Sequence, residues 1–455
     1  MKFVLAGYGS RGDVEPLAAV GRELLRRGHD VCMAVPPNML GFMESAGLAA
    51  VAFGSDSPRP GEGAFTPNAN VRNPIGAATE FMQHVARACA EWSTALLGLA
   101  EGADLLLTGK GEQGLAANVA EHYGIPVAAL HFFPVGQLHP DGVAGRITKE
   151  AEDAQRRALG LPEATGPAHE TLEIQCYDEL CFPEQAAEWA KQGVHRPFVG
   201  APTLVLPAET DAEALSWIAA GTPPIYFGFG SNVSLPSPAE TVAVISMACE
   251  QLGERALICS GVSDFDYIPH FDNVKVVDSV NHAAIFPACR AVVHQGGAGT
   301  TAAGLRAGKP MLVLWFWLED QPIWASAVER LKVGSGRAFS ESTLDSLVAD
   351  LRSILIPECL IRAREVAAQM TTAAQSASSA ADLLENTARD RAGRRGKLWS
   401  SAMGAAAMSS PASPPGGSCR AGVTTCWSLS RPTCSAWWSR WGLPLPPTGR
   451  THGRR

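Results

Sequence analysis

The stretch His294-Gln-Gly-Gly-Ala-Gly-Thr-Thr301 carries the clearest structural signal in this chain. It follows the apolar run at residues 291–293, which is typical of a short buried parallel strand. It precedes a helix-forming stretch at residues 302–307 that ends at Gly308. The pattern therefore predicts a strand, a glycine-rich turn and a helix, in that order.

This turn has the chemistry of an anion site. Three glycines allow a tight turn and let an anion approach the backbone N–H groups. The start of the following helix adds unpaired backbone N–H donors and a partial positive charge of about half an elementary charge. We therefore predict a diphosphate-binding site. The segment lacks the Gly-Lys-Ser/Thr ending of a P-loop and the spacing of a dinucleotide fingerprint. The alternative is a tight strand-to-helix turn that simply needs glycine.

Length and composition indicate a globular protein of more than one domain. The chain has 455 residues, of which 46% are apolar and 18% charged. No apolar run reaches the length of a membrane span, and the N-terminus enters a strand without a signal peptide, so we expect a cytoplasmic protein. The eleven cysteines form no CxxC pair, which argues against a zinc site or a disulfide framework.

Charge separates the body of the chain from its C-terminal tail. The formal net charge is −8, but residues 389–455 carry +10, which leaves −18 on residues 1–388. Such an acidic body argues against a nucleic-acid partner. The tail holds five of the eleven tryptophans and shows no helical or strand period, so we interpret it as a low-order extension that is out of frame or unselected. The alternative is a basic segment that contacts membranes or anions.

Deletion of residues 390–455 is expected to leave both folding and activity intact. The tail has no pattern of apolar residues that could contribute to a hydrophobic core. Circular dichroism and an activity assay on the shortened chain would check this. Loss of either property would show that the tail is a working part of the protein.

The sequence of residues 1–388 predicts two α/β domains joined by a linker. Apolar strands alternate with helical patterns through residues 1–200, and the pattern restarts after a Pro- and Gly-containing linker at 197–207. The predicted strands are at 3–6, 31–35, 50–53, 105–107, 127–130, 225–229, 255–259, 274–277, 291–293 and 311–315. This order predicts two Rossmann-like, doubly wound parallel sheets, at 1–200 and 201–388, which face each other across a cleft.

A second glycine turn follows the first strand. Gly7-Tyr-Gly-Ser-Arg-Gly12 matches GxGxxG, but the second strand ends in two prolines instead of an acidic residue, and Asp13 would repel a pyrophosphate. An NAD-dependent oxidoreductase is therefore disfavoured. We interpret the turn as one that presents Ser10, Arg11 and Asp13 to the cleft. The alternative is that Asp13 is only the N-cap of a helix that Pro16 opens.

Five motifs now occur in a recognisable order. They are Gly9-Ser-Arg-Gly-Asp-Val-Glu-Pro16, Phe229-Gly-Ser231, Val280-Asn-His282, His294 to Thr301, and Asp320-Gln-Pro-Ile-Trp-Ala325. Over about residues 1–388 the chain resembles the UDP-glucuronosyl/UDP-glucosyltransferase superfamily of the GT-B fold. The similarity is greatest to its actinobacterial branch, which glycosylates glycopeptide antibiotics, macrolides and mycobacterial glycopeptidolipids. The tail has no counterpart in that family.

The resemblance implies a catalytic role for Asp13. In the family the aspartate of this turn is the general base for the acceptor hydroxyl. Plant members use a histidine there with a supporting aspartate; this chain has no such histidine, so we expect Asp13 to act alone. A carboxylate at a helix N-terminus should have a lowered pKa, which would make it a weak base. The resemblance also brings Ser10 and Arg11 to the leaving diphosphate.

The resemblance assigns further residues in the second domain. Nucleotide and phosphate contacts are expected from Ser231, His282, His294, Gly296, Gly297, Ala298, Gly299 and Thr300. Contacts to sugar hydroxyls are expected from Glu319, Asp320 and Gln321. Alternatives remain: His282 as a helix-capping loop residue and Asp320 as a plain N-cap. Gln295 stands where many members have a second histidine, and we assign it no role. No cofactor or metal is expected, because the helix terminus neutralises the leaving group.

The substrates are inferred from the same resemblance. The loop at 54–74 and Leu130-His-Phe-Phe-Pro134 fall where the family binds its acceptor. With Trp92 these aromatic residues suit a large hydrophobic or lipidic acceptor, unless they simply fill the core. We expect a dTDP-6-deoxyhexose donor such as rhamnose in preference to UDP-glucose, and a possible peripheral contact with the inner membrane face.

The sequence therefore predicts an inverting, metal-independent glycosyltransferase. It would move a hexose from a nucleotide-diphosphate sugar to a hydroxyl group of a glycopeptidolipid or another natural product. Two alternatives stay open at this point. The first is a nucleotide-sugar epimerase, which would release product without an acceptor. The second is a non-catalytic protein that binds nucleotide sugars and gains nothing from Asp13.

Overall fold

The structure is a computed structural model. It describes residues 1–57, 74–134, 143–163, 171–230, 235, 237–261, 263, 268–316 and 320–407, with backbone alone at 74–85, 143–147 and 391–407. Residues 1–397 form one compact unit and residues 398–455 a second. In the described part of the chain, no helix has the length and apolar character needed to cross a bilayer.

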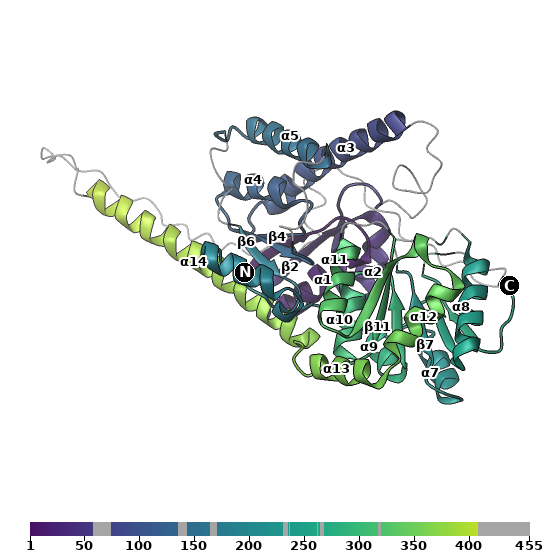
Figure 1. Cartoon of the computed structure of the whole chain (residues 1–455). Helices are drawn as coiled ribbons and strands as arrows, with labels where there is room; N and C mark the ends of the chain where they lie inside the picture. The colour runs from purple at the N-terminus through teal and green to yellow at the C-terminus, as the bar shows by residue number, and fades with distance from the viewer. Residues whose placement is uncertain are drawn as a thin grey trace, which may run out of the picture. The chain divides into compact units, whose positions relative to one another are not determined.

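The first half of the chain forms a six-stranded sheet of parallel strands (Figure 1). Its order is β3 (Ala50–Ala52), β2 (Asp30–Val35), β1 (Lys2–Ala6), β4 (Leu105–Thr108), β5 (Val127–His131) and β6 (Leu172–Gln175). The strand order reverses between β1 and β4. Because ligands in open α/β sheets bind where the order reverses, the carboxyl ends of β1 and β4 are the place to look for a site.

Helices cover both faces of this sheet. They are α1 (Arg11–Arg26), α2 (Leu40–Ser45), α3 (Pro74–Ala100), α4 (Gln113–Tyr123) and α5 (Val143–Ala158), whereas α6 (Pro183–Gln192) follows Phe182, which packs in the core of the second half. The buried side chains of α1 and α2 pack on one face, and those of α3 and α4 on the other. Figure 1 shows α3, α4 and α5 gathered on one side of the strands, in agreement with their mutual contacts.

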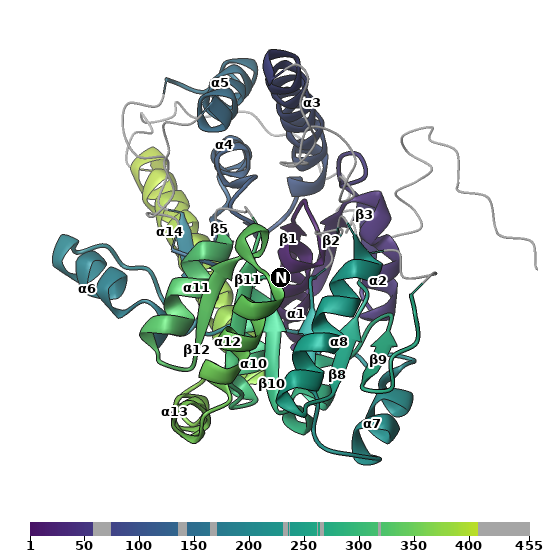
Figure 2. The same cartoon turned by 45° about the vertical axis from the view of Figure 1, so that its right-hand side comes forward.

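The second half repeats the architecture. Its parallel sheet has the order β12 (Gly334–Ala338), β11 (Met311–Trp315), β10 (Ala291–His294), β7 (Ile225–Gly228), β8 (Ala256–Cys259) and β9 (Val274–Val277). Its helices are α7 (Asp211–Ala219), α8 (Pro238–Leu252), α9 (His282–Ile285), α10 (Ala298–Arg306), α11 (Asp320–Arg330), α12 (Leu344–Ile354) and α13 (Pro357–Ala367). The expectation of two doubly wound sheets is confirmed. Figure 2 shows α8 and α12 together on one face of this sheet.

The final helix departs from the sequence-based expectation. Helix α14 (Ala373–Ala407) continues past Thr387, where the sequence indicated no regular structure. Its first half packs into the core of the first sheet through Ala380, Ala381 and Leu384. The side chain of Arg27 on the end of α1 bonds to Asp382 and Glu385 of this helix. Residues near 380 therefore belong to the first core, although the predicted boundary placed them in the second domain.

Arg306, at the end of α10, connects the two segments of chain that pass between the sheets. Its guanidinium donates to the Ala201 carbonyl and the Thr203 hydroxyl on one segment. It also donates to the Thr371 carbonyl and the Ser376 hydroxyl on the other. A partly buried side chain with this many acceptors fixes both segments to α10.

Replacement of Arg306 by Ala is expected to lower the free energy of unfolding by about 3 kcal/mol, because several buried acceptors lose a charged donor at once. Urea denaturation followed by circular dichroism would measure the loss. Arg362 is the matched control, since it is an arginine on α13 that bonds one backbone carbonyl and one exposed carboxylate. Arg362→Ala should cost about 1 kcal/mol or less. Equal losses of stability in the two variants would contradict the role of Arg306 in fixing both segments to α10.

Candidate functional site

His294 ends β10 with its side chain fully buried. Its Nδ1 accepts a hydrogen bond from the Gly296 N–H at 3.1 Å, so in the neutral ring the proton sits on Nε2. No described residue accepts a hydrogen bond from Nε2. Burial, reinforced by the nearby His282, lowers the pKa of His294 to about 3. His294 is therefore a neutral donor whose N–H has no protein acceptor among the described residues.

Helix α10 begins at Ala298, four residues after this histidine. Gly297 is its N-cap, and the first N–H groups of the helix, which include Ala298, Gly299 and Thr300, have no acceptor within the helix. Gly296 has a φ of +96°, and an added Cβ there would lie 3.0 Å from the Gln321 carbonyl oxygen. The predicted strand, turn and helix are confirmed. Gly296 is needed because the chain packs closely there against Gln321. The first backbone N–H groups of α10 still have no acceptor within the helix.

Gln295 has a structural role that the sequence did not reveal. Its side chain is buried, and its amide nitrogen lies 2.2 Å from the place that a Cβ on Gly230 would occupy. Gly230 has a φ of +79° and follows β7, the strand that pairs with β10. Gln295 therefore packs the turn after β7 against the turn after β10. Ser231, the next residue, lies outside the described residues.

His282 is the first residue of α9 and belongs to an aromatic group. Its ring stacks on Phe286 with centroids 4.4 Å apart, and its Nε2 is 3.4 Å from the Tyr226 hydroxyl. The helix cap is supplied by Asn281, whose side chain accepts from the Ala283 N–H, so the capping alternative for His282 is wrong. Burial, together with the positive charge of Arg11, lowers the pKa of His282 to about 4.

Asp13 lies in the turn after β1, at the third position of α1. Its Oδ2 accepts from the Ser10 N–H at 2.7 Å and from the Ser10 hydroxyl at 3.2 Å. Gly9 has a φ of +137°, and an added Cβ there would collide with the Asp13 carboxylate at 2.3 Å. Ser10 is the N-cap, so the interpretation of Asp13 as the cap is wrong.

The expected pKa of Asp13 also needs correction. The helix terminus and the two Ser10 hydrogen bonds favour the charged carboxylate, as the sequence suggested. Burial acts in the opposite direction and is the larger effect, so the pKa of Asp13 is raised above its ordinary value. A carboxylate with a raised pKa is a stronger base than the one expected from sequence.

Arg11 connects the Asp13 turn with the second half of the chain. Its Nε donates to Glu15 at 2.6 Å, and its guanidinium lies 4.8 Å from the Phe42 ring centre. The other oxygen of the Glu15 carboxylate accepts from the Leu204 N–H in the linker. Glu15 therefore joins the start of α1 to the linker, and the positive charge of Arg11 is one of the influences that lower the pKa of His282.

The residues expected to bind the sugar are only partly described. Asp320 is the first residue of α11, and Glu319 lies outside the described residues. Gln321 is 1% exposed, and its side-chain oxygen accepts from the Phe316 N–H at 2.9 Å. This bond occupies one of the two lone pairs of the amide oxygen. The geometry therefore gives Gln321 a role in holding the turn after β11, and its contact with sugar stays a prediction.

The residues proposed to bind the acceptor have different surroundings. His131 is buried and pairs with the Gln113 side chain at 2.8 Å, so it belongs to the interior. Trp92 lies between two aromatic rings, 4.8 Å from Tyr8 and 6.2 Å from Phe53 between centroids. Tyr8 belongs to the same turn as Asp13. Phe132 and Phe133 are half-buried, and most of the loop at 54–74 lies outside the described residues.

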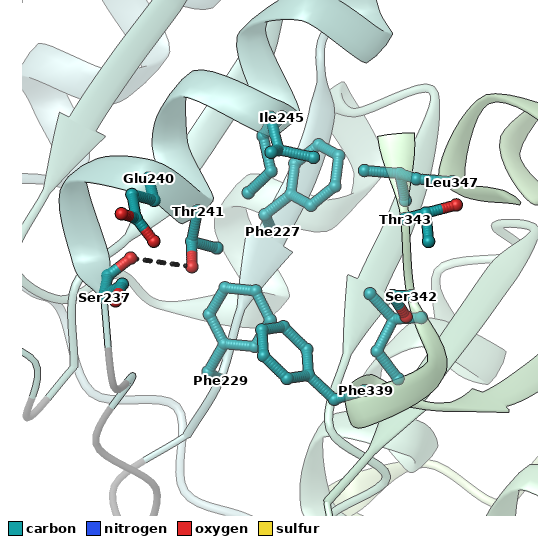
Figure 3. A pocket seen from close by; sticks show the side chains of 12 residues that line it. Phe227, Phe229, Ser237, Glu240, Thr241, Ile245, Phe339, Ser342, Thr343 and Leu347 are labelled. Atoms are coloured by element: carbon teal, nitrogen blue, oxygen red, sulfur yellow. Dashed lines mark hydrogen bonds between the residues drawn. The ribbon is translucent and has the colours of Figure 1, made fainter. Parts of the chain in front are cut away.

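A cavity of about 270 Å³ lies in the second half, away from this site (Figure 3). Side chains from α8, the end of β7 and the start of α12 line it, including Phe229, Thr241 and Phe339. These residues lie on the face of the sheet that packs against α8 and α12, whereas α10 packs on the other face. The cavity is therefore distinct from the turn between β10 and α10.

Sequence reasoning missed one acidic residue of the site. Glu112 stands at the N-cap position of α4 and is 3% exposed, and its Oε1 accepts from the Tyr8 N–H at 3.3 Å. The expectation that Asp13 is the lone base stays a prediction, while a second carboxyl lies beside the turn that holds Asp13. Its position after β4, the neighbour of β1 in the sheet, was the only available signal. Among the described residues, no group of three or more His, Cys, Asp or Glu side chains could hold a metal ion.

Two family models match the chain. The glycosyltransferase family 28 N-terminal domain matches residues 3–104. The erythromycin biosynthesis protein CIII-like C-terminal domain matches residues 257–387. The first match contains the Asp13 turn, and the second contains His282, His294 and Asp320.

Relatives and solved structures agree with these matches. An uncharacterized glycosyltransferase of Mycobacterium tuberculosis, Rv1524, is 57% identical over 86% of this chain and 99% of its own length. The vancomycin aglycone glucosyltransferase of Amycolatopsis orientalis is 30% identical over 84% of this chain and 97% of its own length. The fold is similar to that of the glycosyltransferase VinC, solved in complex with dTDP, with a TM-score of 0.61, 17% identity and coverage of 86% and 100% of the two chains.

Proposed function

Because this chain belongs to the antibiotic-type glycosyltransferases of the GT-B fold, we propose that it moves a hexose from a nucleotide-diphosphate sugar to a hydroxyl group of a hydrophobic acceptor, with inversion and without a metal ion. One observation carries the proposal. The buried His294 presents an Nε2–H that has no acceptor among the described residues, beside the turn from which α10 begins, as expected of a diphosphate site.

The second half would bind the diphosphate of the donor. The N–H of His294 and the first N–H groups of α10 have no protein acceptor among the described residues, which suits the oxygens of a diphosphate. Arg11 would add a positive charge from the first half. As the bond to the sugar breaks, negative charge grows on the departing phosphate, and these fixed donors stabilise it.

Asp13 would act on the acceptor. The acceptor oxygen attacks the anomeric carbon as the carbon–oxygen bond to the diphosphate breaks on the opposite side. Asp13 takes the proton of the attacking hydroxyl, and the electron pair of the broken bond leaves with the diphosphate. One displacement inverts the anomeric centre. The raised pKa of Asp13 supports this role, because a stronger base removes the proton more readily.

The finer identity of the substrates remains part of the proposal. A dTDP-6-deoxyhexose such as rhamnose is our preferred donor, in keeping with the resemblance to the actinobacterial branch and with VinC, which was solved with dTDP. A hydrophobic acceptor, of the glycopeptidolipid or macrolide kind, agrees with the partly exposed rings of Tyr8 and Trp92 beside the Asp13 turn.

A mass-spectrometric screen of donor and acceptor pairs would test the proposal. The purified chain is incubated with dTDP-rhamnose, dTDP-glucose or UDP-glucose and a panel of hydrophobic alcohols, and the products are weighed. We expect a new glycoside with dTDP-rhamnose and its anomeric inversion by NMR. Calorimetry with dTDP, UDP and NADH is the binding control. Binding of NADH in place of nucleoside diphosphates, or product without any acceptor, would overturn the proposal.

A further inference from the structure

Glu112 is a buried carboxyl that the proposed mechanism does not use. It follows β4, whose Thr108 pairs with Ala6 of β1, so the turns after these two strands leave the sheet side by side. Glu112 is 3% exposed and stands at the N-cap position of α4. A buried carboxyl is costly unless it is paired or neutral. The question is therefore which neighbouring groups pair with Glu112 or keep it neutral.

Hydrogen bonds connect Glu112 to the backbone of the Asp13 turn. Its Oε1 accepts from the Tyr8 N–H, and two residues later the Ser10 N–H donates to Asp13. Glycines make room for both carboxyls: an added Cβ would lie 2.3 Å from Asp13 Oδ2 at Gly9 and 3.1 Å from Glu112 Oε2 at Gly109. The two carboxyls thus accept hydrogen bonds from the same short backbone segment, at Tyr8 and Ser10.

No described cation forms an ion pair with Glu112. Asp13 and Tyr8 face it from the turn after β1, and Cys89 faces it from α3. From α5, Glu152 lies against Gly114, where an added Cβ would be 1.8 Å from its carboxyl. Burial, with the negative charge of Asp13 as a further contribution, raises the pKa of Glu112 to about 8.

We propose that Glu112 is a positioning residue for Asp13. It holds the turn at Tyr8 through the backbone N–H and presents a neutral carboxyl beside Asp13, so that the two groups carry a single negative charge and this charge stays on Asp13. The inference rests on the proposed function of Asp13 as the base. During transfer the acceptor proton goes to Asp13, while Glu112 keeps its own proton. Two ionised carboxylates at this turn would repel each other and move Asp13 away from its Ser10 donors.

The first test measures the coupling directly and needs no activity. The full chain is labelled with ¹³C at glutamate carboxyls, and their titration is followed by NMR. A glutamate that titrates near pH 8 should be present in the wild type and absent from Glu112→Gln. In Asp13→Asn the same titration should move down by about one pH unit, because a neighbouring negative charge is gone. An unchanged titration in Asp13→Asn would overturn the proposal.

The second test uses the pH dependence of kcat. Wild-type kcat should fall above about pH 8, where Glu112 ionises, whereas Glu112→Gln should stay within about fivefold of wild type at pH 7 and lose the alkaline fall. Glu112→Ala should lose about 10- to 100-fold in kcat with an unchanged KM for the donor, because the Tyr8 N–H loses its acceptor.

Glu152→Gln is the matched control, since Glu152 is also a carboxyl of raised pKa but lies against Gly114 and not against the Asp13 turn. It should keep the wild-type alkaline fall. Identical profiles for wild type and Glu112→Gln would overturn the proposal, as would a Glu112→Gln variant as inactive as Asp13→Asn. If the wild type transfers no sugar at all, the proposed function fails, while the NMR titration still tests the coupling.

Discussion

Replacement of Asp13 by Asn is expected to lower kcat for sugar transfer by about a thousandfold, which lies within the range that general-base catalysis contributes. Asparagine has nearly the same shape and keeps an oxygen that can accept from the Ser10 N–H. It cannot take the proton of the acceptor hydroxyl. Single-turnover measurements with a matched donor and acceptor would isolate the chemical step.

The binding of nucleotide separates a catalytic defect from a folding defect. Asp13→Asn should bind dTDP with an affinity within about twofold of the wild type, because in the proposed mechanism Asp13 acts on the acceptor and not on the diphosphate. Glu23→Gln is the matched control: it removes a carboxylate from the other end of α1, where Glu23 bonds Arg26 and Arg27, and should transfer sugar normally. If Asp13→Asn transferred sugar at the wild-type rate, Asp13 would not be the general base.

Local signals in the sequence were enough for the turn between β10 and α10. Glycines, an apolar run before them and a helix-forming stretch after them all point to the same structure. The start of α1 was harder to predict, because Pro16 suggested that the helix begins there, whereas it begins at Arg11. A proline within the first turns of a helix removes only one hydrogen bond, and here the deprived carbonyl belongs to the exposed Gly12.

The missed strands lie at edges of their sheets. β6 has the sequence Leu-Glu-Ile-Gln and β12 has Gly-Ser-Gly-Arg-Ala, and neither is the apolar run that marks a buried strand. β12 pairs closely with β11, since an added Cβ at Gly334 would overlap the Met311 carbonyl. Small residues allow this approach, but they give no hydrophobic period to recognise.

The errors at the site have a different origin, because they depend on contacts between distant parts of the chain. The helix terminus around Asp13 was visible in the sequence, but burial of Asp13 was not, so the direction of its pKa was wrong. Glu112 is 99 residues from Asp13 along the chain and reaches the same turn only because β1 and β4 pair. The engagement of the Gln321 oxygen by Phe316 is likewise a consequence of the folded turn.

Replacement of His294 by Ala is expected to weaken the binding of dTDP and of the dTDP-sugar by about 10- to 100-fold, the worth of one hydrogen bond to a charged phosphate. The donor is the Nε2–H, which has no acceptor among the described residues, because Nδ1 already accepts from the Gly296 N–H. Calorimetry would measure the loss. His131→Ala is the matched control: it removes a buried histidine of similarly lowered pKa from the first sheet and should leave nucleotide affinity unchanged.

The protonation state of His294 gives this prediction a second, independent check. Its folded pKa of about 3 lies below the ordinary value near 6.5, so the ring stays neutral from pH 8 down to pH 5. A neutral donor makes the same hydrogen bond throughout this range, and His294 should therefore give the affinity for the dTDP-sugar no pH dependence. The dTDP-sugar is the right probe because its diphosphate has no terminal group that titrates there. If the affinity rises steeply below pH 6 and this rise is lost in His294→Ala, His294 binds the phosphate as a cation and the neutral-donor assignment is wrong.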